Sequence, residues 1–134
     1  MIEKNKENKN STIGSSLLPI LEEYGVDIIF GIPGVHTVEI YRGLHKTSIK
    51  HITPRHEQGA GFMADGYSRV SGKPAVCLVI TGPGLTNILT AMAQARADSI
   101  PMLIISSVNP YDNKRKLSGL LHEFPNQQKL LKKI

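Results

Sequence analysis

Residues 74–99 read "PAVCLVITGPGLTNILTAMAQARADS", and this stretch decides the fold class of the 134-residue chain. It begins with a continuous apolar run, turns on two glycines and a proline, and continues with a helical pattern. An apolar run without polar alternation is typical of a strand that is buried on both faces. We therefore expect a strand over 74–81 and a helix over 82–99, the unit from which parallel sheets are built.

The rest of the chain repeats this alternation. Strands are expected over 26–34, 48–54 and 100–108, and helices over 12–25, 36–46, 56–71 and 127–134. Gly25 ends the first helix, and Pro19 is expected to bend or shorten it. The pattern predicts an α/β fold, a parallel sheet with helices on both faces in three layers. Because another strand is expected beyond the last residue, we interpret this fold as C-terminally incomplete, with a disordered tail over 1–11 and one domain over 12–134.

The composition excludes several classes of protein. A content of 40% hydrophobic and 20% charged residues is typical of a globular domain. The single cysteine, Cys77, excludes a disulfide framework and a multi-cysteine metal site, and it fits a reducing cytoplasm. No apolar run reaches the roughly 18 residues of a membrane span, and the polar first ten residues are no secretory signal. We expect a cytoplasmic protein with no membrane partner.

The net charge of +5 is concentrated at one end of the chain. Residues 113–134 carry six basic and one acidic side chain, and this difference of five equals the whole excess. A nucleic-acid-binding surface is typically a broad basic face interleaved with aromatic residues. Aromatic residues make up only 5% of this chain and tryptophan is absent, so no nucleic-acid partner is expected.

Three of the predicted strands end in distinctive loops. These are "GIPG" at 31–34, "PRHE" at 54–57 and "TGPG" at 81–84. In open parallel sheets, ligands bind beyond the carboxyl ends of the strands, which all lie at one edge. The convergence of the three loops therefore predicts a site at that edge.

The glycine loops leave the class of ligand open. The stretch "TGPGLTN", at 81–87, places backbone N–H groups at the start of a helix, which suits an anion. It lacks the Lys-Ser/Thr pair of a P-loop and the spacing of GxGxxG, and a plain strand-to-helix turn is the alternative. The prolines make these loops stiff and leave few donors, which suits a flat ring better than a diphosphate.

Other residue patterns predict no metal and no nucleophile. The histidines at 36, 45, 51, 56 and 122 lack the spacing of metal ligands, and no serine lies in a GxSxG pattern. The small residues of "GAGFMADG", at 59–66, predict the close approach of another helix, including one from a second subunit.

Glu57 lies where a buried strand passes into a closely packed helix. A buried carboxylate needs either a partner or a ligand. It could be structural, complementing the dipole of the helix, and Arg55 could pair with a nearby acid. For this Arg-His-Glu triplet alone the structural interpretation is favoured, whereas the convergence of the three loops favours a ligand.

Three segments resemble a known family. They are "YGVDIIFGIPG" at 24–34, "RHEQGAGFMADGYSRVSGKPAVCLVITGPGLTN" at 55–87 and "ARADSIPMLIISS" at 95–107. In this order and spacing they resemble the N-terminal pyrimidine-binding domain of thiamine-diphosphate-dependent enzymes, in the acetolactate synthase and 2-oxo acid decarboxylase group. The resemblance runs from about residue 12 to about residue 110, and "LHEFPNQQ", at 121–128, is similar to the same group.

The resemblance implies a role for named residues. Glu57 would be catalytic, hydrogen-bonding the N1′ nitrogen of the cofactor's aminopyrimidine and so promoting removal of the thiazolium C2 proton. The implied cofactor-binding residues are Pro33, Gly34, Glu57, Thr81, Pro83 and Asn87. No metal ligand is implied in this chain, because the family binds Mg²⁺ and the diphosphate through another domain, whose Gly-Asp-Gly motif and later Asn are missing here.

The resemblance also implies partners. These are a diphosphate-binding domain or subunit, further copies in a homo-oligomer, and a 2-oxo acid substrate. The chain would be either a fragment of a longer enzyme or the small subunit of a split decarboxylase, and inactive alone. A non-catalytic regulatory or assembly module of the same fold is the alternative, although the intact Glu57 argues against it.

Overall fold

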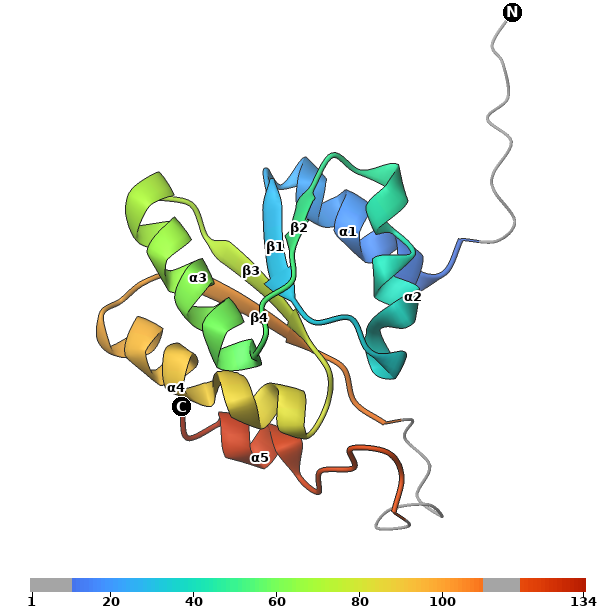
Figure 1. Cartoon of the computed structure of the whole chain (residues 1–134), viewed down its shortest axis with the longest axis vertical. Coiled ribbons are helices and arrows are strands. Elements are labelled where there is room, and N and C mark those ends of the chain that lie inside the picture. The colour runs from blue at the N-terminus through green and yellow to red at the C-terminus, as the bar shows by residue number, and fades with distance from the viewer. Residues whose placement is uncertain (1–10, 110–118) are drawn as a thin grey trace, which may run out of the picture.

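The computed structural model describes residues 11–109 and 119–134, and a four-stranded parallel sheet lies at its centre (Figure 1). All but one residue of the predicted tail falls outside the described residues. The strands are β1 (Ile28–Gly31), β2 (Lys50–Ile52), β3 (Ala75–Val79) and β4 (Met102–Ser106). Their order across the sheet is β2-β1-β3-β4, and every neighbouring pair is parallel.

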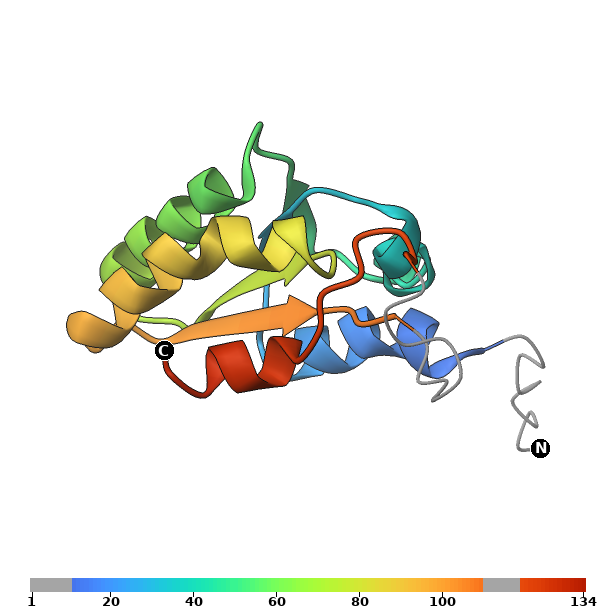
Figure 2. The same cartoon turned by 90° about the horizontal axis from the view of Figure 1, so that it is seen from below.

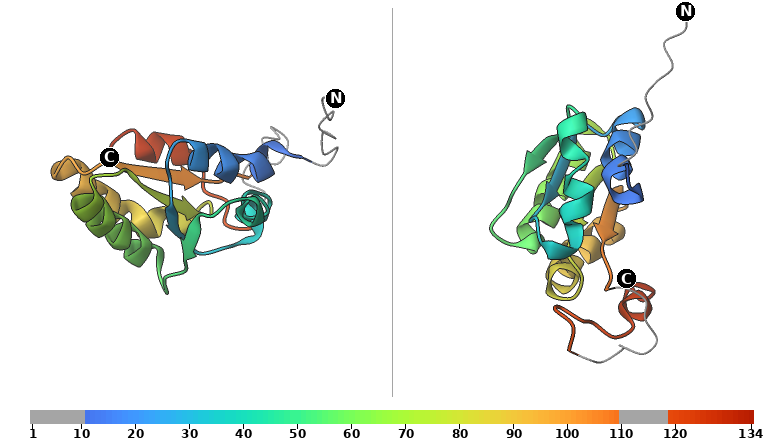
Figure 3. Two further views of the ribbon diagram at one scale, coloured as in Figure 1. Left: turned by 90° about the horizontal axis from the view of Figure 1, so that it is seen from above. Right: turned by 90° about the vertical axis from the view of Figure 1, so that its right-hand side faces the viewer.

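Helices cover both faces of this sheet, which confirms the predicted α/β architecture (Figures 2 and 3). One face carries α1 (Ile13–Glu23) and α2 (Val38–Tyr41), and the other carries α3 (Glu57–Ser71) and α4 (Pro83–Ala97). The short helix α5 (Gln127–Leu131) lies alongside β4. Within the two described ranges, no helix has the length and apolarity needed to cross a membrane.

The central strand β3 joins the two halves of the core. All five of its residues are buried, as the continuous apolar run predicted. Cys77 and Val79 pack with α3 and α4, whereas Val76 packs with Leu18 of α1 on the opposite face. The alternation of side chains along a strand therefore supplies two apolar layers from one short segment.

The first helix runs through Pro19 instead of ending there. Thr12 and Ser15 form a capping box at its start, and the turn after it uses Gly25, whose φ of +86° favours glycine. Pro19 has no N–H to donate to the Ser15 carbonyl. That carbonyl instead lies against Gly43, where an added Cβ would approach its oxygen to 2.6 Å.

The single helix predicted over 36–46 is wrong. The segment forms a 3₁₀ turn over Val35–Thr37, the four-residue α2, and a second 3₁₀ turn over Leu44–Lys46. The Gly43 N–H donates to the Ile40 carbonyl with a spacing of three residues, which tightens the chain where it passes Ser15. A helical pattern in sequence could not reveal this tertiary approach.

The small residues of α3 allow α4 to pack closely. A Cβ added at Gly61 would lie 2.4 Å from the Ala91 Cβ and 2.9 Å from Ile88 Cγ1. The close helix predicted from "GAGFMADG" is therefore present in the same chain. This contact holds the two helices side by side.

Candidate functional site

The loops after β1 and β3 meet around one side chain at the carboxyl edge of the sheet. A Cβ added at Gly34 would lie 2.6 Å from Ile80 Cγ2, and a Cβ added at Gly84 would lie 2.6 Å from Ile80 Cγ1. Ile80 follows directly after β3, so both backbones approach the end of the central strand. The structure thus brings two of the three predicted loops together.

The third loop delivers Glu57 as the first residue of α3. His56 is the N-cap of this helix, and its Nδ1 accepts a hydrogen bond from the Gln58 N–H at 3.1 Å. Glu57 is half-buried and is the acidic residue of the first turn, where a carboxylate is favoured by the helix dipole. Arg55 is exposed and has no ion pair within the described ranges, so the alternative that Arg55 pairs with an acid is not found there.

Glu57 faces the first turns of α4. Asn87 Nδ2 donates a hydrogen bond of 2.9 Å to Glu57 Oε2. The other carboxylate oxygen, Oε1, would lie 3.6 Å from a Cβ added at Gly84. One corner of the edge therefore holds the predicted residues Glu57 and Asn87, together with Gly84 and its neighbour Pro83.

Thr81 is buried, and its hydroxyl contacts a residue that the sequence did not point to. Its Oγ1 donates to Gln127 Oε1 at 2.8 Å, and the Gly82 N–H donates to the same oxygen at 3.1 Å. The Gln127 Nε2 donates to Ser106 Oγ and to the Ser107 carbonyl, both at 3.2 Å. Gln127 is 7% exposed and ties the turn after β3 to the end of β4.

The two prolines of the glycine loops lie at the surface. Pro33 and Pro83 are both exposed, and Pro83 opens α4, where the missing N–H has no cost. Next to Pro33, the Gly34 N–H donates to Thr37 Oγ1 at 3.1 Å, and Thr37 is completely buried. Thr37 thus fixes the loop after β1, a role that its position in an apparent helix concealed.

A tyrosine–histidine pair lies at the end of β1. His51 Nε2 is 3.1 Å from both the Tyr41 hydroxyl and the Gly31 carbonyl oxygen. Burial lowers the pKa of His51, opposed in part by the hydrogen bond to Gly31, and burial raises the pKa of Tyr41. The pair joins β1, β2 and α2 beneath the loop after β1.

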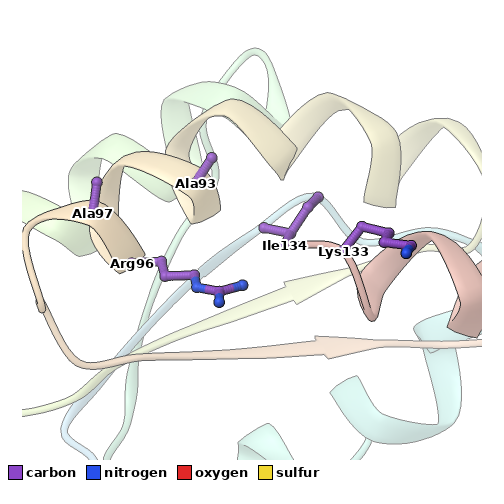
Figure 4. Close-up of a pocket in the computed structure, with 5 residues that line it drawn as sticks. All are labelled: Ala93, Arg96, Ala97, Lys133 and Ile134. Atoms are coloured by element: carbon purple, nitrogen blue, oxygen red, sulfur yellow. The ribbon is translucent and has the colours of Figure 1, made fainter.

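Two further features lie apart from these residues. No group of three His, Cys, Asp or Glu side chains in the described part of the chain could hold a metal ion. A shallow hollow between the end of α4 and the C-terminus is lined by Ala93, Arg96, Ala97, Lys133 and Ile134 (Figure 4). None of the predicted site residues lines this hollow.

Comparison with known proteins gives one matching family. Residues 11–130 match the thiamine pyrophosphate enzyme family, through the sequence model of its N-terminal TPP binding domain. The chain is 61% identical over 120 residues to the probable 2-ketoarginine decarboxylase AruI of Pseudomonas aeruginosa, a match that covers 90% of this chain and 22% of the relative.

Acetolactate synthases are similar as well. The chain is 48% identical to the isozyme 1 large subunit of Escherichia coli, over 76% of this chain and 18% of the relative. It is 44% identical to the mitochondrial catalytic subunit of Saccharomyces cerevisiae, over 74% of this chain and 15% of the relative. The chain thus spans about a fifth of the length of the curated relatives it matches.

Proposed function

This chain belongs to the thiamine pyrophosphate enzyme family, as its N-terminal TPP binding domain, and we propose that its carboxyl edge binds the aminopyrimidine ring of thiamine diphosphate. The observation that carries the proposal is the hydrogen bond from Asn87 to Glu57 beside Gly84. This bond orients the Glu57 carboxylate at the edge of the sheet where ligands bind in parallel sheets.

The residues at this edge fit a flat heterocycle. A Cβ added at Gly84 would lie 2.6 Å from Ile80 Cγ1 and 3.6 Å from Glu57 Oε1, so glycine lets the start of α4 approach both side chains. Gly34 approaches the same Ile80 side chain from the loop after β1. An apolar side chain beside a fixed carboxylate suits a ring with apolar faces and nitrogen atoms on its rim.

Each residue has a separate task in this proposal. When bound, thiamine diphosphate supplies the carbon nucleophile that attacks a 2-oxo acid. Glu57 holds a proton at the ring nitrogen, which a carboxyl group can share and an amide cannot. Asn87 engages Oε2, and Oε1 lies beside Gly84. Thr81 contributes through the turn that Gln127 fixes, while Pro33 and Pro83 stiffen the two glycine loops.

We propose a 2-oxo acid as the substrate class. The relative that is 61% identical over 90% of this chain bears the name of a 2-ketoarginine decarboxylase, which favours a decarboxylase acting on a 2-oxo acid with a guanidino end. The lower identities to acetolactate synthases make joining of two 2-oxo acids the second candidate.

We propose that another domain or subunit binds the diphosphate with Mg²⁺, and that the assembled enzyme is a cytoplasmic homo-oligomer. By the assembled enzyme we mean this chain together with that diphosphate-binding part. The outer side of α3 supports a partner there, because Phe62, Met63 and Val70 are 42%, 46% and 90% exposed. This surface lies on the helix that Glu57 begins.

Calorimetry and a decarboxylation assay test the proposal. The assembled enzyme is expected to bind thiamine diphosphate and to release CO₂ from 2-ketoarginine. The 134-residue chain alone is expected to bind the cofactor weakly or not at all, because each 1.4 kcal/mol of lost contact lowers affinity about tenfold. Micromolar binding by the chain alone would refute this division of the site. An assembled protein that binds no cofactor would instead support the non-catalytic module.

A further inference from the structure

A second group of polar side chains lies at the carboxyl edge and was given no task in the function proposed above. It comprises His36 after β1, Asn109 after β4, and His122. His36 Nε2 lies 2.9 Å from Asn109 Oδ1, and because β3 separates β1 from β4 in the sheet, this bond bridges the end of β3. The His122 carbonyl oxygen would lie 2.3 Å from a Cβ added at Gly82.

The contacts of Asn109 fix the tautomer of His36. Asn109 Nδ2 donates to the Leu121 carbonyl at 3.3 Å, which leaves Oδ1 to face the imidazole. An amide oxygen only accepts, so His36 Nε2 carries the hydrogen. In the neutral ring, Nδ1 then has a lone pair and is a hydrogen-bond acceptor.

His36 Nδ1 has no hydrogen-bond partner among the described residues, although it is shielded from solvent. The hydroxyl of Ser107, which follows β4, is likewise shielded and has no hydrogen-bond partner among the described residues. Buried polar atoms almost always have a partner, so each exception calls for one from outside the described residues. The partner that Nδ1 lacks is a donor.

We propose that His36 Nδ1 accepts a hydrogen bond from the substrate and selects 2-oxo acids that carry N–H donors at the end remote from the oxo group. A guanidinium group is such an end, since it has five N–H donors and no acceptor. The inference rests on the proposed function, because it names the residue that recognises the substrate of that site. The His122 ring, whose centroid is 6.0 Å from that of His36, is exposed beside it.

Two substitutions at one position separate the contacts of His36. In His36→Gln the amide can replace Nε2 and keep the bond to Asn109, but the acceptor at the Nδ1 position is lost. In His36→Asn an amide oxygen can accept near the Nδ1 position, while the contact to Asn109 is lost. His45→Gln is the matched control, because His45 is an exposed histidine on the second 3₁₀ turn.

The experiment compares 2-ketoarginine with 2-oxohexanoate, which has no donor at its remote end, in the assembled enzyme. His36→Gln is expected to lower kcat/KM for 2-ketoarginine by about tenfold to a hundredfold, mainly through KM. For 2-oxohexanoate the change is expected to stay below about twofold. His36→Asn should retain more of the activity toward 2-ketoarginine than His36→Gln, and His45→Gln should match the wild type.

A spectroscopic measurement on the wild type does not depend on the folding of a variant. In assembled enzyme with ¹⁵N-labelled histidine, the Nδ1 resonance of His36 is expected to move on addition of 2-ketoarginine and to stay in place with 2-oxohexanoate. An unmoved resonance, or equal losses for both acids in His36→Gln, would overturn the inference while the proposed function stands. Turnover of neither acid by the wild type would overturn the proposed decarboxylase activity, and this inference with it.

Discussion

Asn87 on α4 donates a hydrogen bond of 2.9 Å to the carboxylate of Glu57 on α3, across 30 residues of sequence. The two helices begin at the same edge of the sheet, one after β2 and the other after β3. Glu57 is therefore directed by a helix other than its own. An acid that only complemented its helix dipole would not require such a partner.

Replacement of the acid tests its catalytic role most directly. Glu57→Gln keeps the shape of the side chain but cannot share a proton with a ring nitrogen. Since general acid–base catalysis typically contributes about 10²–10⁴-fold, we expect turnover of the assembled enzyme to fall by that order. Cofactor affinity should fall much less, because the proposed diphosphate contacts lie elsewhere.

Deuterium exchange at the cofactor C2 position, followed by NMR, checks this expectation. Exchange should be much slower with Glu57→Gln than with the wild type. A purely structural Glu57 would cost roughly 0.3–1 kcal/mol of stability on substitution and leave exchange unchanged. Equal exchange rates would thus end the catalytic assignment.

The hydrogen bond from Asn87 has a matched control on the same helix. Gln94 Nε2 donates to Asp98 Oδ2 at 2.9 Å, also an amide-to-carboxylate bond, but near the opposite end of α4. Asn87→Ala and Gln94→Ala are each expected to lower the free energy of unfolding by about 0.5–1.5 kcal/mol. Only Asn87→Ala should also slow C2 exchange, because only that bond directs Glu57. Similar exchange in both variants would contradict a positioning role for Asn87.

Two glycines of α3 are expected to respond oppositely to alanine. A Cβ at Gly61 would lie 2.4 Å from the Ala91 Cβ, whereas a Cβ at Gly66 would meet no atom within 4 Å. Gly61→Ala should lower the free energy of unfolding by about 1–3 kcal/mol through overpacking. Gly66→Ala should raise it by about 0.5–1 kcal/mol, because alanine favours the helix. Urea unfolding of the 134-residue chain measures both, and changes of the same sign would be inconsistent with close α3–α4 packing.

The partly buried His51 should make stability depend on pH. Burial lowers its pKa in the folded chain, so below about pH 6.5 the unfolded chain binds the proton more readily. The contribution of His51 to stability is therefore expected to decrease as the pH falls below that value. His51→Gln should show a shallower loss than the wild type in urea unfolding series over this range. Parallel curves would indicate that His51 titrates alike in both states.

The main elements of the fold could be predicted because their signals are local. The apolar run at 74–81 shows by itself that β3 is buried on both faces, and the structure confirms this. The glycines and prolines after the strands mark the loops, and the parallel arrangement then brings the loops to one edge. The helix expected over 36–46 failed because Gly43 passes the Ser15 backbone, a contact between segments that no local pattern records.

For the candidate site, the positions of residues along the chain could be predicted, but their contacts could not. The position of Glu57 follows from the "PRHE" loop, but its bond to Asn87 depends on how α3 and α4 pack. The place of His56 directly before the helix makes it a candidate N-cap. The residue type gave no such signal, because histidine is not among the favoured N-cap residues. The contacts of Gln127 could not be predicted, although it lies in the "LHEFPNQQ" stretch, because its partners are distant in sequence and a glutamine in a basic stretch resembles a surface residue.

The position of Gln127 also bears on the order in which the chain folds. Its contact with Thr81 spans 46 residues, so the turn after β3 gains this bond only when a segment close to the end of the printed sequence has docked. During synthesis, the four strands can pair before residue 127 leaves the ribosome, while the turn beside Glu57 is still unsecured. A nascent chain can therefore form its sheet before the turn after β3 is fixed.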